Sequence, residues 1–201
     1  MLIQSILYMF KMENDEIKNL IKKQKINHTL DQQFYINDDI FELDVKNIFY
    51  KQWVFVGHVS RIPNLGDYFL FNIGKESIII IRDEDNNIHA HYNVCRHRGS
   101  HICLEEQGNK KLFVCPYHAW SYHLNGTIKS ARMMNDDFNK EEWSLHKCNL
   151  KIFEGLIFIN LSDKPNSFDE FISPTKKFIE FHGLADAKIA HRKTYPTEGN
   201  W

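Results

Sequence analysis

Two short segments, each carrying one cysteine and one histidine, constrain this chain more than any other feature. The first is Cys95-x-His97, and the second is Cys115-x-x-His118. Thiolates and imidazoles are metal ligands, and two loops at the ends of adjacent strands would bring all four side chains around one small inorganic centre. Two thiolates can then hold one ion and two imidazoles another. The spacing therefore predicts a two-iron site.

A single zinc ion is the alternative interpretation of the same four ligand types. Zinc fingers usually place their two cysteines together and their two histidines together on a helix, whereas here cysteine and histidine alternate within loops. The other cysteines, Cys103 and Cys148, lack a histidine at ligand spacing. We expect both to be small, buried apolar residues rather than redox groups. No secretory signal is recognisable, so the even number of cysteines favours metal binding or catalysis over disulfides.

Runs typical of β-strands surround the two ligand segments. They are rich in β-branched and aromatic residues and are separated by turn formers, which predicts an antiparallel meander closing into a small all-β barrel or sandwich between Trp53 and Leu161. Asp85-Asn86-Asn87 and Asn125-Gly126 are expected hairpin turns, and Asn-Gly best tolerates positive φ at both central positions. The expected strands are WVFVGHV (53–59), DYFLFNI (67–73), ESIIIIR (76–82), IHAHYNV (88–94), KLFV (111–114), AWSYHL (119–124), TIKSA (127–131) and LKIFEGLIFINL (150–161).

Helical patterns precede these strands. The spacing of apolar residues over 14–25 predicts a short amphipathic helix with a charged outer face. Asp38 or Asp39 is expected to cap a second helix, which should run out near Trp53. We therefore divide the beginning of the chain into an N-terminal helical segment at residues 1–36 and a domain at residues 37–162.

The last part of the chain, residues 163–201, changes character again. Ser167-Phe-Asp-Glu170 is typical of a capping box that opens a helix, and Pro174 is expected to break or restart that helix. A final strand is predicted from Lys188 to Tyr195, with no strand near it in sequence to pair with. We expect this region to be a connector and the truncated start of a further α+β domain, cut at Trp201.

Charge and apolar patterning exclude several classes of partner. Lysine and arginine total 25 against 26 for aspartate and glutamate, and neither sign forms a long run, which argues against nucleic acid and anionic membranes as partners. The longest apolar stretch, Met1 to Phe10, is about half the roughly 20 residues that a membrane span requires. The cytoplasm is the default expectation. Met12 is an alternative start of translation.

The strings NVCRHRGS and VCPYHAWSYHLNG resemble the Rieske fingerprint in the N-terminal domain of aromatic-ring-hydroxylating and quaternary-amine oxygenase α subunits. The likeness includes FYKQWVFVGHVSRIPNLGDYF and GLIFINL, so roughly Phe34 to Trp201 is similar to the family. It implies a mainly β fold: a small antiparallel Rieske barrel or sandwich with flanking helices and the first elements of a truncated catalytic domain. It also implies a [2Fe–2S] cluster whose ligands are Cys95, His97, Cys115 and His118.

The resemblance carries a function as well. It implies an oxidoreductase that passes electrons from a reductase or ferredoxin to a mononuclear Fe(II), which is expected only in a C-terminal domain that these residues lack. It also implies a homo-oligomer of the full-length protein. The residues given should transfer an electron without hydroxylating a substrate, and we assign no catalytic residue among the scattered His123, His146, His182 and His191. A stand-alone Rieske ferredoxin and a zinc-stabilised interaction module are the alternatives.

Several neighbours of the ligands have two interpretations. Trp120 and Tyr117 either cover the cluster, as the resemblance implies, or are plain core aromatics. Gly99 and Gly108 are expected to allow positive φ or a close approach of the backbone. Arg96, Arg98 and His101 either give the tip of the loops a positive charge or are ordinary solvated residues.

Overall fold

The computed structural model describes residues 14–135 and 137–197. The chain divides into two compact units, residues 1–49 with 193–201 and residues 50–192. The expectations for Met1–Phe10, Met12 and Trp201 lie outside the described residues. No helix in residues 14–135 and 137–197 is both long and apolar enough to cross a membrane.

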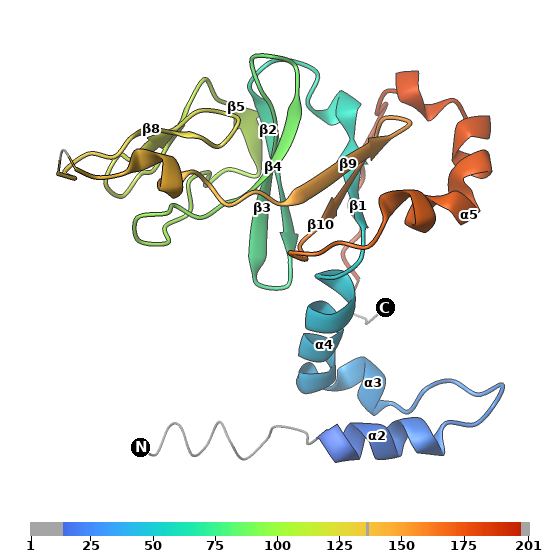
Figure 1. The fold of residues 1–201 in the computed structure, drawn as a ribbon. Helices are drawn as coiled ribbons and strands as arrows, with labels where there is room; N and C mark the ends of the chain where they lie inside the picture. Colours follow the sequence, from blue (N-terminus) through green and yellow to red (C-terminus); the bar gives the residue numbers. More distant parts are fainter. Residues whose placement is uncertain (1–13, 136, 198–201) are drawn as a thin grey trace, which may run out of the picture. The chain divides into compact units, whose positions relative to one another are not determined.

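The first unit is helical. It contains α2 (Asn14–Lys23), α3 (Gln33–Ile36) and α4 (Asp38–Asp44), and α4 passes into a π-helical turn at Val45–Phe49 (Figure 1). Helix α2 confirms the predicted amphipathic segment, and it has acidic residues in its first turn and lysines in its last. These charges oppose the helix dipole, so they stabilise a short helix that buries little surface.

The cap of α4 differs from the prediction. Asn37 is the capping residue, and its side-chain oxygen accepts hydrogen bonds from the backbone N–H groups of Asp39 and Ile40 at 2.9 and 3.3 Å. Asn37 is extended, with φ −90° and ψ 122°, whereas Asp38 and Asp39 already lie within the helix. A capping side chain must precede the first helical residue to reach those N–H groups, and only Asn37 does.

The second unit contains ten strands in three antiparallel sheets (Figure 1). The strands β2, β3 and β4 form the predicted meander. The first predicted strand belongs elsewhere, because it pairs with β10 in a separate sheet. The described residues form no closed barrel, so the sandwich expectation is the correct one. The sheets are β1 (Val54–His58), β10 (Leu156–Asn160) and β9 (Asn149–Phe153); β4 (Ile88–Tyr92), β3 (Glu76–Arg82), β2 (Asp67–Ile73) and β5 (Gln107–Asn109); and β6 (Phe113–Val114), β7 (Ser121–Tyr122) and β8 (Ile128–Ser130).

The four-stranded sheet lies between the other two, which explains the run of four isoleucines in β3. All of Ile78–Ile81 are fully buried. Ile78 and Ile80 join a core with residues of β1 and β10, while Ile79 and Ile81 join a second core with residues of the β6–β8 sheet. A strand covered on both faces needs no alternation of polar and apolar residues. The sequence did not predict β5, because Gln107-Gly108-Asn109 has no apolar residue to signal a strand.

Two hairpin turns lie where the sequence places them. Asn86 has φ 68° in the turn between β3 and β4, and Gly126 has φ 87° in the turn between β7 and β8, whereas Asn125 keeps negative φ. Gly126 is required for a second reason: a Cβ there would lie 2.5 Å from the ring of His91. His91 is fully buried, its Nε2 lies 3.0 Å from the carbonyl of Leu124, and burial lowers its pKa to about 4.

The C-terminal helix α5 (Phe168–Phe181) confirms the predicted cap but not the predicted break. Ser167 accepts a hydrogen bond from the N–H of Glu170 at 3.3 Å. Pro174 lies inside a continuous helix. Proline removes a single helical hydrogen bond here, and the buried residues Phe168 and Ile172 hold the turn before it against Trp53 and Phe158.

The predicted strand from Lys188 to Tyr195 is wrong. These residues have no regular secondary structure, and no described strand pairs with them. A strand is defined by hydrogen bonds to a neighbour, so an extended, β-rich run without a neighbouring edge does not become one.

Candidate metal centre

The two predicted ligand segments form loops of the same backbone design. In the first, the N–H of Gly99 donates to the carbonyl of Cys95 at 3.0 Å, and the N–H of Cys95 donates to the carbonyl of Ser100 at 2.8 Å. In the second, Ala119 and Trp120 take the equivalent places around Cys115, at 3.0 and 2.8 Å. The residue four after each cysteine has positive φ, 73° at Gly99 and 57° at Ala119. Each loop thus closes through hydrogen bonds to the backbone of its own cysteine, with His97 or His118 inside the closed loop.

The loops bring the four side chains together by type. Cys95 and Cys115 are both buried in the same core, and burial, with a smaller contribution from the Cys115 thiol, raises the pKa of Cys95. The rings of His97 and His118 lie with their centroids 4.7 Å apart, in an edge-to-face arrangement. The two cysteines thus share one core, and the two histidine rings contact each other.

The imidazole nitrogens supply the test of whether these residues fit a metal centre. The Nδ1 atoms of His97 and His118 are buried, and neither has a hydrogen-bond partner among the described residues. A buried polar atom without a partner costs free energy, which a metal ion at this position would offset. Burial, followed by the nearby His118 and Arg98, lowers the pKa of His97 and so favours the neutral ring that binds metals.

The four side chains come as a pair of cysteines and a pair of histidines, with one of each in each loop. Structural zinc needs four donors around one ion. A sulfur pair and a nitrogen pair, each serving its own ion, match the arrangement of a histidine-ligated diiron centre.

A tyrosine hydroxyl lies beside one of the sulfurs. The hydroxyl of Tyr122 is 3.3 Å from Cys95 Sγ, and it accepts a hydrogen bond from the backbone N–H of Arg96 at 3.2 Å. Because that N–H can only donate, the hydroxyl proton is free to point at the sulfur. Burial raises the pKa of both Tyr122 and Cys95. Tyr122 was not among the candidates from sequence, although the expected strand 119–124 puts residues 120 and 122 on one face.

The two histidines have different surroundings. The ring of Trp120 stacks on His97 with centroids 4.8 Å apart and planes 9° apart, and Trp120 is only 1% exposed. Tyr117 contacts His118 at 3.8 Å between centroids, but it is 60% exposed. Of the two aromatic residues singled out from sequence, Trp120 lies in the core and Tyr117 lies at the surface.

The remaining sequence candidates fall into clear places. Gly99 has the expected positive φ, and Gly108 shows the expected close approach, since a Cβ there would lie 3.1 Å from the ring of Tyr68. Cys103 and Cys148 are buried as predicted, and burial raises their pKa values to about 11 and about 12.

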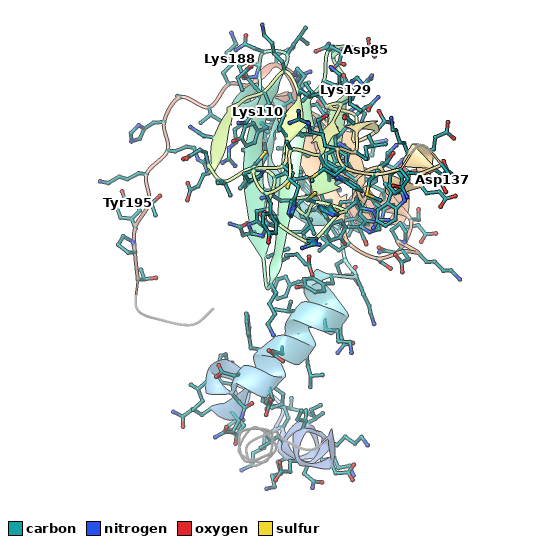
Figure 2. All side chains as sticks on the ribbon, turned by 90° about the vertical axis from the view of Figure 1, so that its left-hand side faces the viewer. Asp85, Lys110, Lys129, Asp137, Lys188 and Tyr195 are labelled. Atoms are coloured by element: carbon teal, nitrogen blue, oxygen red, sulfur yellow. The ribbon has the colours of Figure 1, made fainter. Side chains whose placement is uncertain are left out.

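The charged residues at the tip of the loops divide in the same way. Arg98 and His101 are exposed, whereas the side chain of Arg96 turns back to contact His146 and Trp143. Figure 2 faces the end of the molecule that carries β5 and β8, where Lys110, Lys129 and Asp137 place charges of both signs.

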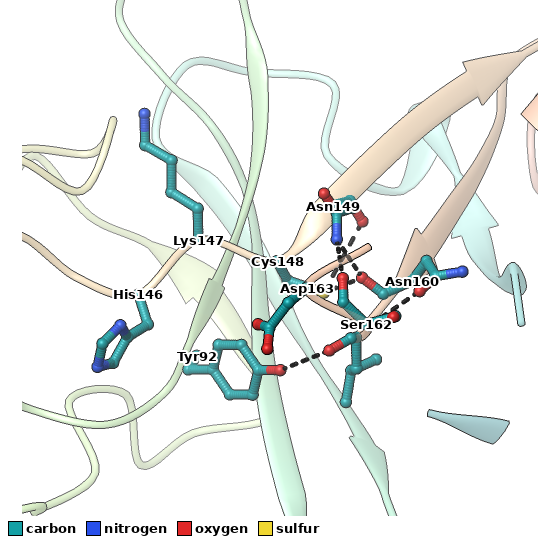
Figure 3. Close-up of a pocket in the computed structure, with 9 residues that line it drawn as sticks. Tyr92, His146, Lys147, Cys148, Asn149, Asn160, Ser162 and Asp163 are labelled. Carbon is teal, nitrogen blue, oxygen red and sulfur yellow. Dashed lines mark hydrogen bonds between the residues drawn. The ribbon is translucent and has the colours of Figure 1, made fainter. Parts of the chain in front are cut away.

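A cleft of about 430 Å³ lies between the end of β4 and the neighbouring ends of β9 and β10, and none of the proposed ligands lines it (Figure 3). The hydroxyl of Tyr92 donates to the carbonyl of Leu161 at 3.5 Å, and the amide of Asn149 donates to the carbonyls of Asn160 and Ser162 at 3.0 and 2.7 Å. These polar groups satisfy one another. The cleft is lined by Tyr92, His146, Lys147, Cys148, Asn149, Asn160, Leu161, Ser162 and Asp163.

Comparison with known proteins adds independent evidence. The family model for the Rieske [2Fe-2S] domain matches residues 52–153. The glycine betaine monooxygenase oxygenase subunit of Pseudomonas aeruginosa (strain UCBPP-PA14) is 35% identical over 184 residues, which are 91% of this chain and 43% of that protein. The benzene 1,2-dioxygenase subunit alpha of Pseudomonas putida is 30% identical over 192 residues, which are 94% and 42% of the two chains.

Solved structures give the same result. Naphthalene 1,2-dioxygenase from Rhodococcus sp. superposes with a TM-score of 0.78 and 30% identity, over 85% of this chain and 41% of that chain. The quaternary ammonium Rieske monooxygenase CntA superposes with a TM-score of 0.73 and 31% identity, over 79% and 48%. The chain thus spans less than half the length of the relatives that it matches.

Proposed function

The chain belongs to the Rieske [2Fe-2S] domain family, and we propose that it is the electron-entry part of an oxygenase α subunit. In this proposal Cys95 and Cys115 bind one iron of a [2Fe–2S] cluster, and His97 and His118 bind the other. The observation that carries the ligand assignment is the pair of buried, unpartnered Nδ1 atoms, one in each loop.

The cluster, when bound, would accept and release one electron, at a potential raised by the two neutral imidazoles in place of thiolates. The protein's own residues set the conditions for this. Trp120 covers the ring of His97 and excludes water from that side. Tyr122 offers a proton to Cys95 Sγ, where it would stabilise the negative charge of the reduced state. The histidines are the natural electron exit, since an imidazole can hydrogen-bond a partner through its second nitrogen.

The proposal extends to partners and substrate class. A reductase or ferredoxin would supply the electrons, and a mononuclear iron in the part of the relatives that this chain does not match would receive them. The matched relatives act on glycine betaine, benzene and naphthalene by name, so we propose a ring-hydroxylating dioxygenase or a monooxygenase or demethylase of amines. The match to oxygenase subunits over 91% of the chain supports this over a stand-alone ferredoxin. A homo-oligomer of the full-length protein and a cytoplasmic location complete the proposal.

Visible and electron paramagnetic resonance spectra of the purified, metal-loaded protein test the ligand set. We expect a red-brown protein whose reduced form has the low average g-value of a histidine-ligated diiron centre. A colourless protein with one zinc per chain, or a reduced spectrum typical of an all-cysteine cluster, would overturn the proposal.

A further inference from the structure

Arg96 lies between two proposed ligands, Cys95 and His97, and its partly buried side chain turns back onto the protein. The guanidinium contacts Nε2 of His146, and its central carbon lies 5.7 Å from the ring centroid of Trp143. The Nε atom is buried. The segment after β8 that carries Trp143 and His146 thus holds the first ligand loop through one side chain.

These contacts close a ring that includes His97. Trp143 packs edge-on against Trp120, with centroids 5.8 Å apart and planes 79° apart, and Trp120 stacks on His97. Residues 96 and 97 therefore contact opposite ends of the same tryptophan pair. Because the two residues are adjacent in the chain, these contacts hold both side chains against the same pair of tryptophans.

The chemistry of this position favours arginine over lysine. A planar guanidinium can donate to an imidazole nitrogen and lie near an indole face at the same time, whereas an ammonium group is a point charge that cannot match both geometries. Burial and the Arg96 cation lower the pKa of His146, so its ring stays neutral and accepts the hydrogen bond. In the described part of the chain, no carboxylate lies within ion-pair distance of Arg96.

We propose that Arg96 is a positioning residue for the cluster: it ties the first ligand loop to Trp143 and His146, fixes the plane of the His97 imidazole against Trp120, and keeps a positive charge beside the centre. The inference rests on the proposed function, because it assigns Arg96 a role toward the cluster that these ligands would hold. A positive charge at this position favours the more negative, reduced state and so raises the midpoint potential.

The test compares substitutions in the cluster-loaded protein, with Arg98→Gln as the matched control. Arg98 is on the same loop and also follows a proposed ligand, but it is exposed. The readouts are the midpoint potential and the nitrogen hyperfine couplings of the ligating histidines in the reduced protein, which report ring orientation.

Arg96→Gln should lower the midpoint potential more than Arg98→Gln does, and it alone should change the nitrogen couplings of one histidine. Arg96→Lys should leave the midpoint potential close to that of the wild type but still change those couplings. Lysine keeps the positive charge but lacks the planar guanidinium that contacts both His146 and Trp143. Trp143→Leu should reproduce the change in couplings with little effect on potential. The role of Arg96 is overturned if Arg96→Gln matches Arg98→Gln in both readouts, or if Trp143→Leu leaves the couplings unchanged.

Failure of the proposed function would look different. A wild-type protein without the spectrum of a histidine-ligated diiron centre would remove the ligand assignment itself. A wild-type protein with that spectrum, together with unaltered couplings in the Arg96 and Trp143 variants, would remove only the role of Arg96.

Discussion

The two ligand loops have the same backbone hydrogen bonds but differ in the side chains that pack against them. Both close with the same pair of hydrogen bonds on their cysteine, and both place a positive φ four residues later. In the first loop, His97 stacks on the buried Trp120, and Arg96 contacts Trp143 in the segment that follows β8. The second has its histidine against Tyr117, which is mostly exposed.

The loop backbone and the covering side chains therefore have different roles at the proposed centre. Two similar loop backbones hold the four proposed ligands, and the side chains that cover each loop differ in burial. The aromatic residue that contacts His97 is buried, whereas the one that contacts His118 is mostly exposed. Substitutions at equivalent positions of the two loops should therefore have similar effects where they change the shared backbone. They should have different effects where they change the covering residues, Trp120 and Tyr117.

The largest expected effect is one in which the loops agree. Cys95→Ser and Cys115→Ser should each abolish the visible absorption and the bound iron almost completely, because each removes one of two thiolates from the same iron. Cys103→Ser should leave the spectrum nearly unchanged, because Cys103 shares the core with the two ligand cysteines but has no histidine at ligand spacing. Iron analysis and visible spectra give the readout. Retention of a full spectrum after either ligand change would break the equivalence of the loops.

Substitutions of the two covering residues, Trp120 and Tyr117, should differ in their effect on the free energy of unfolding. Trp120→Ala should destabilise the protein by about 3–5 kcal/mol, as expected for a large buried aromatic residue. Tyr117→Ala should stay within about 0.5 kcal/mol, as expected at an exposed site. Denaturant unfolding of both variants measures the difference. Equal losses of stability would show that the second loop is as well covered as the first.

The positive φ in each loop predicts effects of opposite sign. Gly99→Ala should cost about 1–2 kcal/mol, because an L side chain is strained in the left-handed region. Crowding does not contribute, since no atom lies within 4 Å of the added Cβ. Ala119→Gly should stabilise by about 1 kcal/mol for the converse reason. Unfolding midpoints of the two variants in parallel check this, and a shift in the same direction for both would contradict the shared backbone design.

The smallest expected effect concerns the hydroxyl beside Cys95. Tyr122→Phe should cost about 1 kcal/mol in stability for the lost hydrogen bonds and should lower the midpoint potential, because the reduced state loses a donor to sulfur. Tyr68→Phe is the control: its hydroxyl donates to the carbonyl of Glu105, and Cys103 is the thiol beside it. Redox titration of both variants separates them. A potential that responds equally to both changes would exclude a specific bond to Cys95.

Much of the fold was readable from the chain because the signals were local. The runs that became β2, β3 and β4 carry β-branched and aromatic residues over their full length, and turn formers separate them. The predictions that were wrong concerned long-range pairing or a competition between neighbours. The partner of β1 is β10, far along the chain, and the cap of α4 is Asn37 rather than the aspartates beside it.

The sequence by itself determined the donor types, their spacing in two loops and the β-rich context, because each of these is a property of adjacent residues. Only the tertiary structure decided that the two cysteines would join one core and the two histidine rings would meet edge to face, and that Trp120 would cover His97 while Tyr117 stayed exposed. It also decided that the hydroxyl of Tyr122 would lie beside Cys95 and that Arg96 would turn back to His146 and Trp143. These outcomes depend on which sheets pack together and which segments cross over them. Such contacts join residues that are distant in the chain, so no local pattern encodes them.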